Sequence, residues 1–281
     1  MYQEVFLISL ALIWVLFASL QDIKKRIVSD WLNFSFIIFV FGFRFFYSLF
    51  ELDGFFFFYQ GIVGFLIFLL LGNALYYAKF FGGGDAKLMI ALGAVLPLTD
   101  SILSDLEMMA TFFVIFLLVG SFYGLFWSVG VVFSSGKFKT YGKDFKKQFK
   151  KAKALNYFSF ALGIVLISMF FFEQLFLYLG ILVLLIPLLY IHSKTIDDSF
   201  LIKRINTSSL EEGDWIFRDV KIKGKIINPS WPGLTKVQIR EIKKTHKTIQ
   251  IRYGIPFVPV FFISLAILVY FFFSGIGLNF P

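Results

Sequence analysis

Two aspartates, Asp22 and Asp85, are the residues of this sequence best suited to chemistry. Asp22 ends an apolar run in "LFASLQDIKKRIVSDWLNF", and Asp85 begins another directly after three glycines in "FFGGGDAKLMIALG". A carboxylate at the edge of hydrocarbon is costly unless it has a partner or a task. Two carboxylates in one low-dielectric site cannot both ionise easily, so one keeps its proton while the other acts as a base. Such a pair can activate water for attack on a peptide carbonyl.

The glycines before Asp85 suit the approach of a substrate. Gly82, Gly83 and Gly84 lack a Cβ, so we expect backbone to come close there and φ to turn positive. An extended peptide could then lie across the break and hydrogen-bond to it. A phosphate-binding loop is excluded because no GK[ST] follows and an acid stands where an anion would bind. A plain helix break, in which Asp85 caps the next helix, is the structural alternative.

The remaining polar residues near the apolar runs are expected to be structural. Ser29 and Asp30 fit the N-cap of the second run. Arg44, inside that run, is expected to snorkel to the outer surface or to pair with a neighbouring helix. His192 and His246 are isolated in the sequence. The chain has no cysteine, which excludes disulfides, thiolate metal sites and a cysteine nucleophile, and we expect neither metal nor cofactor.

The composition predicts the elements that carry these acids. Hydrophobic residues make up 58% of the chain and charged residues 16%, against about 25% charged in a soluble domain, and the mean hydropathy is +0.81. We therefore predict an all-α polytopic membrane protein of about 6–8 transmembrane helices with a small α+β cytoplasmic module. The first run lacks a basic start and a cleavage site, so it is expected to be retained. Candidate spans cover residues 4–20, 31–50, 55–78, 86–98, 108–133, 156–172, 174–191 and 255–273.

Two of these spans leave alternatives open. Residues 86–98 are short for a bilayer, so this span is expected to extend into the next loop or to lie beside a thinned region. Residues 156–191 fit two spans with a turn at Glu173 and Gln174, or one tilted helix with a surface segment.

The charges predict the orientation of the chain. All of the 27 basic residues except Arg44 lie in alternate loops, and the opposite loops carry acids only. The positive-inside rule places the basic loops, and with them Asp22 and Asp85, at the cytoplasmic face of the cell membrane. The net charge of +9 then indicates contact with anionic lipid headgroups rather than nucleic acid. The acids of the opposite loops are Glu51, Asp53, Asp100, Asp105, Glu107 and Glu173.

Two polar segments complete the predicted organisation. Aromatic residues recur at helical spacing among lysines in 134–155, which favours an amphipathic helix on the membrane surface over a solvated loop. In 192–254 we expect a hairpin turning near Gly224 and a helix capped by Thr235. The predicted domains are a catalytic membrane domain at 1–191, a small cytoplasmic module at 192–254 and a last transmembrane helix at 255–281.

The residues around both acids resemble the type IV prepilin peptidase family. Residues 82–85 match its GxGD motif, "GGGDAKLM" extends the match through Lys87, and "QDIKKRIVSDW" is similar to its first aspartate segment. The archaeal preflagellin and prepilin peptidase branch fits best, since "YGIPFVP" at 253–259 is similar to the entry to its last span. The resemblance covers roughly 1–133 and, more weakly, 211–273. Val28-Ser29-Asp30 stands where bacterial members have Ile-Pro-Asn, and the chain has more spans than the compact archaeal form.

This resemblance implies an aspartic endopeptidase with Asp22 and Asp85 as the catalytic pair. The substrates would be pilin- or archaellin-like precursors, whose short basic leader is cut at the cytoplasmic face. Gly82, Gly83, Gly84 and Lys87 would bind the substrate. Two alternatives stay open: a presenilin-like protease that cuts within membrane helices, and a cation transporter that uses the paired carboxylates.

Overall fold

The computed structural model describes residues 2–50, 54–222, 225–231 and 233–274, so Glu51, Asp53 and Gly224 lie outside the described residues. The chain forms two compact units, one of residues 1–125 with 255–281 and one of residues 126–254. These units are defined by contacts between residues of the chain. The predicted domains 1–191, 192–254 and 255–281 are instead defined by whether a segment is expected in the membrane or in the cytoplasm. The predicted division therefore stays a prediction.

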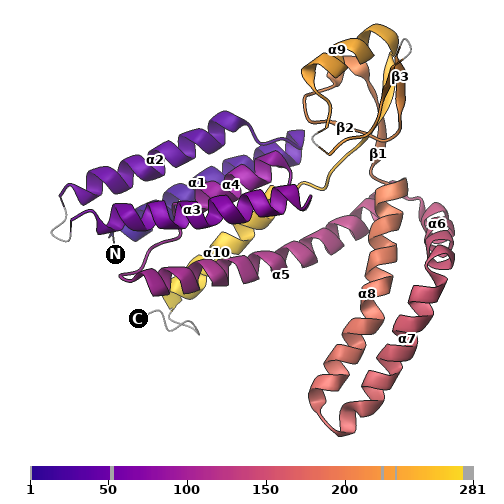
Figure 1. Ribbon diagram of the computed structural model, residues 1–281, viewed down its shortest axis with the longest axis horizontal. Helices are drawn as coiled ribbons and strands as arrows, with labels where there is room; N and C mark the ends of the chain where they lie inside the picture. The colour runs from indigo at the N-terminus through magenta and orange to yellow at the C-terminus, as the bar shows by residue number, and fades with distance from the viewer. Residues whose placement is uncertain (1, 51–53, 223–224, 232, 275–281) are drawn as a thin grey trace. The chain divides into compact units, whose positions relative to one another are not determined.

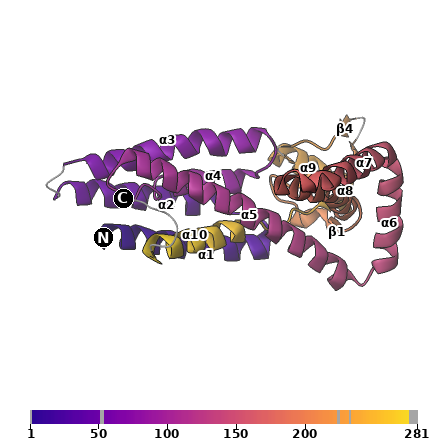
Figure 2. The same ribbon diagram turned by 90° about the horizontal axis from the view of Figure 1, so that it is seen from below.

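The first unit consists of helices packed side by side (Figure 1). α10 lies along α1 in both views, although the two helices are far apart in the sequence (Figures 1 and 2). α3 packs against α4 and α2, and α2 also contacts α1 and α4. Its helices are α1 (Tyr2–Lys25), α2 (Asp30–Ser48), α3 (Phe56–Tyr77), α4 (Gly83–Gly93), α5 (Ile102–Ser135, shared with the second unit from residue 126) and α10 (Val258–Ser274).

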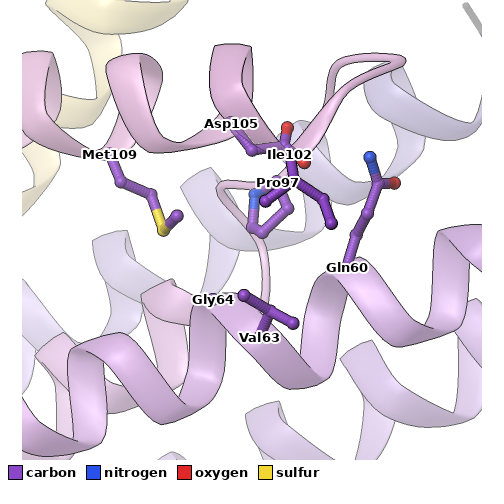
Figure 3. Close-up of a pocket in the computed structure, with 7 residues that line it drawn as sticks. All are labelled: Gln60, Val63, Gly64, Pro97, Ile102, Asp105 and Met109. Atoms are coloured by element: carbon purple, nitrogen blue, oxygen red, sulfur yellow. The ribbon is translucent and has the colours of Figure 1, made fainter.

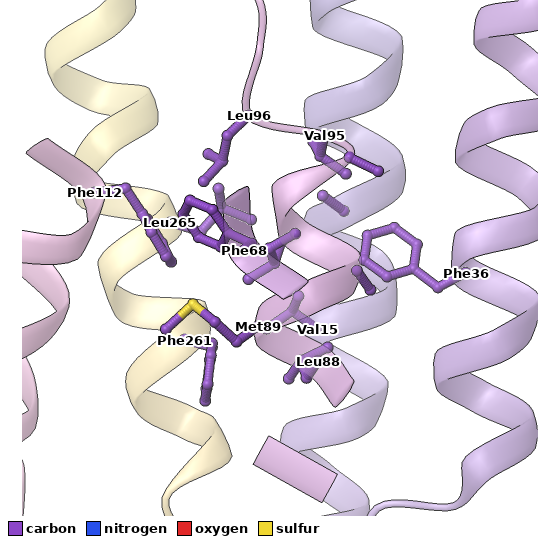
Figure 4. Packing of buried hydrophobic residues seen from close by; sticks show 14 of the residues in the cluster. Val15, Phe36, Phe68, Leu88, Met89, Val95, Leu96, Phe112, Phe261 and Leu265 are labelled. Carbon is purple, nitrogen blue, oxygen red and sulfur yellow. The ribbon is translucent and has the colours of Figure 1, made fainter. Parts of the chain in front are cut away.

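The core of the first unit surrounds α4. Figure 4 shows Leu88 and Met89 of α4 enclosed by side chains from α1, α2, α3, α5 and α10. Both residues are buried, as are the neighbours that the figure labels: Val15, Phe36, Phe68, Phe112, Phe261 and Leu265. Because protein rather than lipid covers it, α4 need not be long enough to cross a bilayer.

Only part of the predicted span at 86–98 is helical. α4 has only 11 residues, about 16 Å at 1.5 Å per residue, and the helix ends at Gly93. Non-helical backbone follows, and within a membrane such backbone must be satisfied by the protein itself.

Arg44 satisfies this backbone. Its guanidinium donates from Nε to the Ala94 carbonyl (2.8 Å) and from Nη2 to the carbonyls of Val95 (3.1 Å) and Pro97. Nη1 donates to the Phe57 carbonyl at 2.6 Å, and Asp105 interacts with the same charge. Arg44 has no exposed surface, so it pairs with neighbouring elements and does not snorkel.

Glycines let α3 approach these partners closely. A Cβ at Gly61 would lie 2.5 Å from Cδ of Arg44, and one at Gly72 would lie 3.0 Å from the Ala86 carbonyl oxygen. Small residues at a helix crossing are the usual means of close packing in membrane proteins. α3 therefore fixes α4 along its length.

The second unit begins with the end of α5 and continues through a helical hairpin. α7 and α8 pack against each other, with Gly163 and Gly180 at their closest approach, and the chain turns at Glu173 as predicted for two separate helices. His192 accepts or donates hydrogen bonds with Ser128 Oγ (2.7 Å) and the Tyr141 hydroxyl (2.8 Å), which is a structural role. The elements are α6 (Phe138–Lys151), α7 (Lys153–Ser168), η1 (Met169–Phe171) and α8 (Gln174–Ser199).

A small α+β region completes the second unit. β5 lies between β1 and β2 in an antiparallel sheet, and β3 pairs with β4 as the predicted hairpin, with Ile222 opposite Lys225. Thr235 caps α9 by accepting the Gln238 N–H at 3.3 Å, as predicted. The elements are β1 (Ile202–Asn206), η2 (Thr207–Ser209), β2 (Trp215–Ile216), β3 (Val220–Ile222), β4 (Lys225–Ile227), α9 (Lys236–Thr245) and β5 (Thr248–Arg252).

The fold class is confirmed. Among the described residues, 6 helices are long and apolar enough to cross a membrane, namely α1, α2, α3, α5, α7 with η1, and α8. The described part of α10 is apolar but shorter. α6 is a helix with its lysines on one side, so the amphipathic helix is also present.

We predict that the Arg44 contacts are a major source of stability in the first unit. Arg44→Met leaves several buried carbonyls without donors and should lower the free energy of unfolding by about 3 kcal/mol or more. Arg44→Lys keeps the positive charge but lacks the several N–H donors of the guanidinium, so its decrease in the free energy of unfolding should be intermediate. Unfolding in detergent micelles measures both.

Ile38→Met is the matched control, because Ile38 lies on the same helix with 69% of its surface exposed. Its effect should stay within about 0.5 kcal/mol. Equal stability of the Arg44→Met and Ile38→Met proteins would contradict the proposed role of the guanidinium.

Candidate active site

Asp22 lies in the last turn of α1 and faces the start of α10. Its Oδ2 accepts the backbone N–H of Val258, the first residue of α10, at 3.0 Å, and the backbone of Phe257 also hydrogen-bonds to it. Only 7% of its surface is exposed. The first N–H groups of a helix have no partner within that helix, so a carboxylate at this position satisfies them.

Asp85 is the third residue of α4 and caps that helix. Its Oδ2 accepts the Gly82 N–H at 3.1 Å. The structural alternative considered for this acid, a helix cap, is therefore present. It does not exclude chemistry, because an ionised carboxylate has about four lone-pair sites and the cap uses one. Asp85 is half-buried and keeps access to its surroundings.

The two carboxyl groups meet in the first unit. Asp22 and Asp85 are close enough for the charge of one to act on the other, although 63 positions separate them in the sequence. α1 and α4 carry them, and α10 and Gly82 hold them by backbone N–H groups. Like charges that act on each other make it costly to ionise both acids at once.

The expectation of positive φ in the glycine motif is wrong. Gly82 is extended, with φ −69° and ψ 165°, and α4 begins at Gly83. The glycines are instead needed for space: a Cβ at Gly84 would lie 3.2 Å from Cβ of Val28, and one at Gly82 would lie 3.3 Å from Oδ2 of Asp85. Gly83 has no such neighbour within 4 Å.

Lys87 and Asp30 contact each other beside this motif. Lys87 Nζ forms an ion pair with Asp30, and both side chains are partly exposed. Ser29 occupies the N-cap position of α2 but makes no side-chain cap, which differs from the expectation. The side chain of Gln21 hydrogen-bonds to both the hydroxyl and the backbone N–H of Ser29. Nε2 of Gln21 donates to Ser29 Oγ at 2.6 Å, and Oε1 accepts the Ser29 N–H at 2.9 Å.

Three groups near Asp22 were missed by sequence reasoning. They are the backbone of residues 257–258, Arg26 and Tyr123, and both side chains interact electrostatically with Asp22 or its neighbours. The segment "YGIPFVP" gave a signal, since prolines at 256 and 259 mark a helix start. Arg26 follows Asp22 by four positions, a spacing at which side chains on a helix are neighbours, so the sequence did carry a signal for it. Tyr123 carries no local signal.

A small pocket lies elsewhere in the first unit. Figure 3 shows it between α3, the chain after α4 and the start of α5, next to the Arg44 contacts. The aspartates are at the other end of α4, so this pocket is no part of their site. Its lining residues are Gln60, Val63, Gly64, Pro97, Ile102, Asp105 and Met109.

Comparison with known proteins gives this site a class. Residues 9–129 match the type IV leader peptidase family, and this segment contains Asp22, Asp85 and the glycine motif. The chain is therefore a membrane peptidase of the aspartic type. The matched segment is similar to the type IV leader peptidase family, and that similarity points to prepilin-like substrates. No curated protein and no solved structure matches the chain.

We predict that the three glycines differ in their tolerance of a side chain. Gly84→Ala should reduce peptidase activity about 10-fold or more, because overpacking against Val28 costs about 1–3 kcal/mol and displaces the turn before Asp85. Gly82→Ala should reduce it through contact with Asp85 itself. Gly83→Ala is the matched control for packing, and its loss should be the smallest of the three, because a Cβ there has no neighbour within 4 Å. Cleavage rates of a prepilin-like precursor measure all three, and an equal loss in all three variants would contradict this account.

Proposed function

We propose that the chain removes the short basic leader from archaeal preflagellin- or prepilin-like precursors at the cytoplasmic face of the membrane. The match of residues 9–129 to the type IV leader peptidase family supports the peptidase chemistry. The observation that carries the proposal is the electrostatic contact of Asp22 with Asp85 in a largely buried setting. The basic loops beside α1 and α4 support the cytoplasmic placement.

The proposed reaction uses one ionised and one protonated carboxyl group. The ionised group takes a proton from water as the water oxygen bonds to the peptide carbonyl carbon, and the protonated group gives its proton to the carbonyl oxygen. In the next step the C–N bond breaks, and the leaving amine takes the proton that the base received from water. As the carbonyl re-forms, a hydroxyl of the tetrahedral intermediate gives its proton to the other carboxylate. Water and peptide are consumed, an acid and an amine are released, and the pair returns to one shared proton.

The glycine motif is the proposed contact for the substrate backbone. Gly82 is extended and Gly83 is exposed, so an extended peptide can approach Asp85 from this side. Lys87 is proposed to take part in substrate binding, because it lies two residues after Asp85. Its ion pair with Asp30 holds its side chain near α2. The acids also favour a leader that carries positive charge.

The archaeal branch and the lipid contacts belong to the same proposal. The polar region of residues 201–252 stands before the last apolar helix, as the resemblance to that branch implies, and the chain lacks cysteine. The lysine-rich face of α6 is proposed to contact anionic headgroups, which attract basic amphipathic helices.

The test is a leader-processing assay with three asparagine variants. Asp22→Asn and Asp85→Asn should each abolish trimming of a co-expressed preflagellin or prepilin precursor, because neither amide can take or give the required proton. Asp30→Asn should retain most of it, since Asp30 is an acid of the same region that pairs with Lys87 instead. Shortening of the precursor, followed by mass spectrometry of the new N-terminus, is the readout.

Several results would sink the proposal. Normal trimming by Asp85→Asn would remove the catalytic pair. A cut in the middle of a transmembrane helix would favour a presenilin-like activity, and an intact leader in the presence of the unsubstituted protein would remove the proposed substrate class.

A further inference from the structure

We propose that the first turn of α10 is a positioning element that holds Asp22 as the ionised general base, which leaves Asp85 as the proton donor. This inference rests on the proposed function and extends it. It assigns different roles to the two acids, and it gives the backbone N–H of Val258 a role in the reaction.

The first argument is the geometry of the contact. Val258 is fully buried and its N–H points to Oδ2 of Asp22 at 3.0 Å, with the Phe257 backbone as a second partner. Backbone N–H groups at a helix start carry partial positive charge and stabilise a negative group in front of them. A protonated carboxyl group at this position would lose most of that stabilisation.

The second argument is the set of charges that face Asp22. Asp85 approaches from α4, Arg26 from the end of α1 and Tyr123 from α5. Arg26 attracts the ionised form of Asp22, whereas the acidic partner opposes ionisation of both groups. Asp85 accepts one N–H, from Gly82, the N-cap residue of its own helix. The shared proton is therefore more favourable on Asp85.

The third argument is that one aromatic cluster anchors both backbone donors. Phe81 directly precedes Gly82, Phe257 directly precedes Val258, and their ring centroids are 6.2 Å apart. Phe116 of α5 contacts both rings at 5.7 Å. Gly120 allows this packing, since a Cβ there would lie 2.9 Å from Cζ of Phe257. The two turns that hold the acids are thus fixed relative to each other.

Val258→Pro tests the proposed contact. Proline lacks the N–H but fits the first position of a helix, so α10 should persist. We expect kcat to fall about 10-fold or more, because a hydrogen bond to a charged group is lost, while KM stays within about 2-fold. The acidic limb of the pH–rate profile should move to higher pH by about one unit, since Asp22 becomes harder to ionise.

Val258→Ala is the matched control. It removes buried methyl groups but retains the N–H, so the acidic limb of its pH–rate profile should stay at the same pH even if loss of packing lowers the rate. Replacing residue 258 by the corresponding α-hydroxy acid removes the N–H and keeps the valine side chain. This ester variant should reproduce the lower kcat and the shifted limb, and it decides the question if Val258→Pro fails to fold.

The outcomes separate this inference from the proposed function. A folded ester variant with unchanged kcat and an unchanged acidic limb overturns the role of α10, even where Asp22→Asn and Asp85→Asn are inactive. Processing that persists in both asparagine variants overturns the proposed function itself. A lower kcat with a shifted limb in the ester variant, absent from Val258→Ala, supports the inference.

Discussion

The ends of the short helix α4 impose the constraint on which the first unit depends. Backbone groups within a membrane protein have no water to bond with, so a helix that ends among other helices needs donors and acceptors from the protein. The described residues supply an acceptor for the start of α4 and donors for the carbonyls that follow its end. Asp85 accepts the Gly82 N–H at one end, and Arg44 donates to the carbonyls of Ala94, Val95 and Pro97 at the other. A carboxylate and a guanidinium thus hold the two ends of a helix that is shorter than a bilayer is thick.

The same rule explains the place of the other acid. α10 also begins inside the first unit, and Asp22 accepts the N–H of its first residue. Each proposed catalytic carboxylate is therefore also the partner of a helix start. This double role lowers the energy of keeping acids in a poorly solvated site. It also means that alanine at either position would remove a helix contact, whereas asparagine keeps an oxygen that can accept the N–H, so stability and activity must be measured together in any aspartate variant.

Much of this fold is predictable from the sequence, and the reasons for the failures are physical. Long apolar runs predict the long helices, and Thr235 predicts the cap of α9 because the cap is local. The end of α4 was missed because apolar residues continue to 98, and apolarity reports burial rather than helix. Its carbonyls depend on Arg44, about fifty positions away. The contact of Asp22 with Val258 spans 236 positions, which no local pattern encodes.

Arg26 shows how the site and the chain path are linked. It ends α1 in the left-handed region, with φ 61°, and its N–H donates to the Asp22 carbonyl at 2.8 Å. A residue with a Cβ costs about 1 kcal/mol or more in this conformation, and glycine is the usual choice. Glycine at this position would relax the backbone but would remove the charge that acts on Asp22. The arginine therefore combines a strained helix end with a positive group beside the proposed base. Lys79, just after α3, has the same conformation (φ 66°), so the strain alone does not mark a site, and the charge of Arg26 is the feature that bears on Asp22.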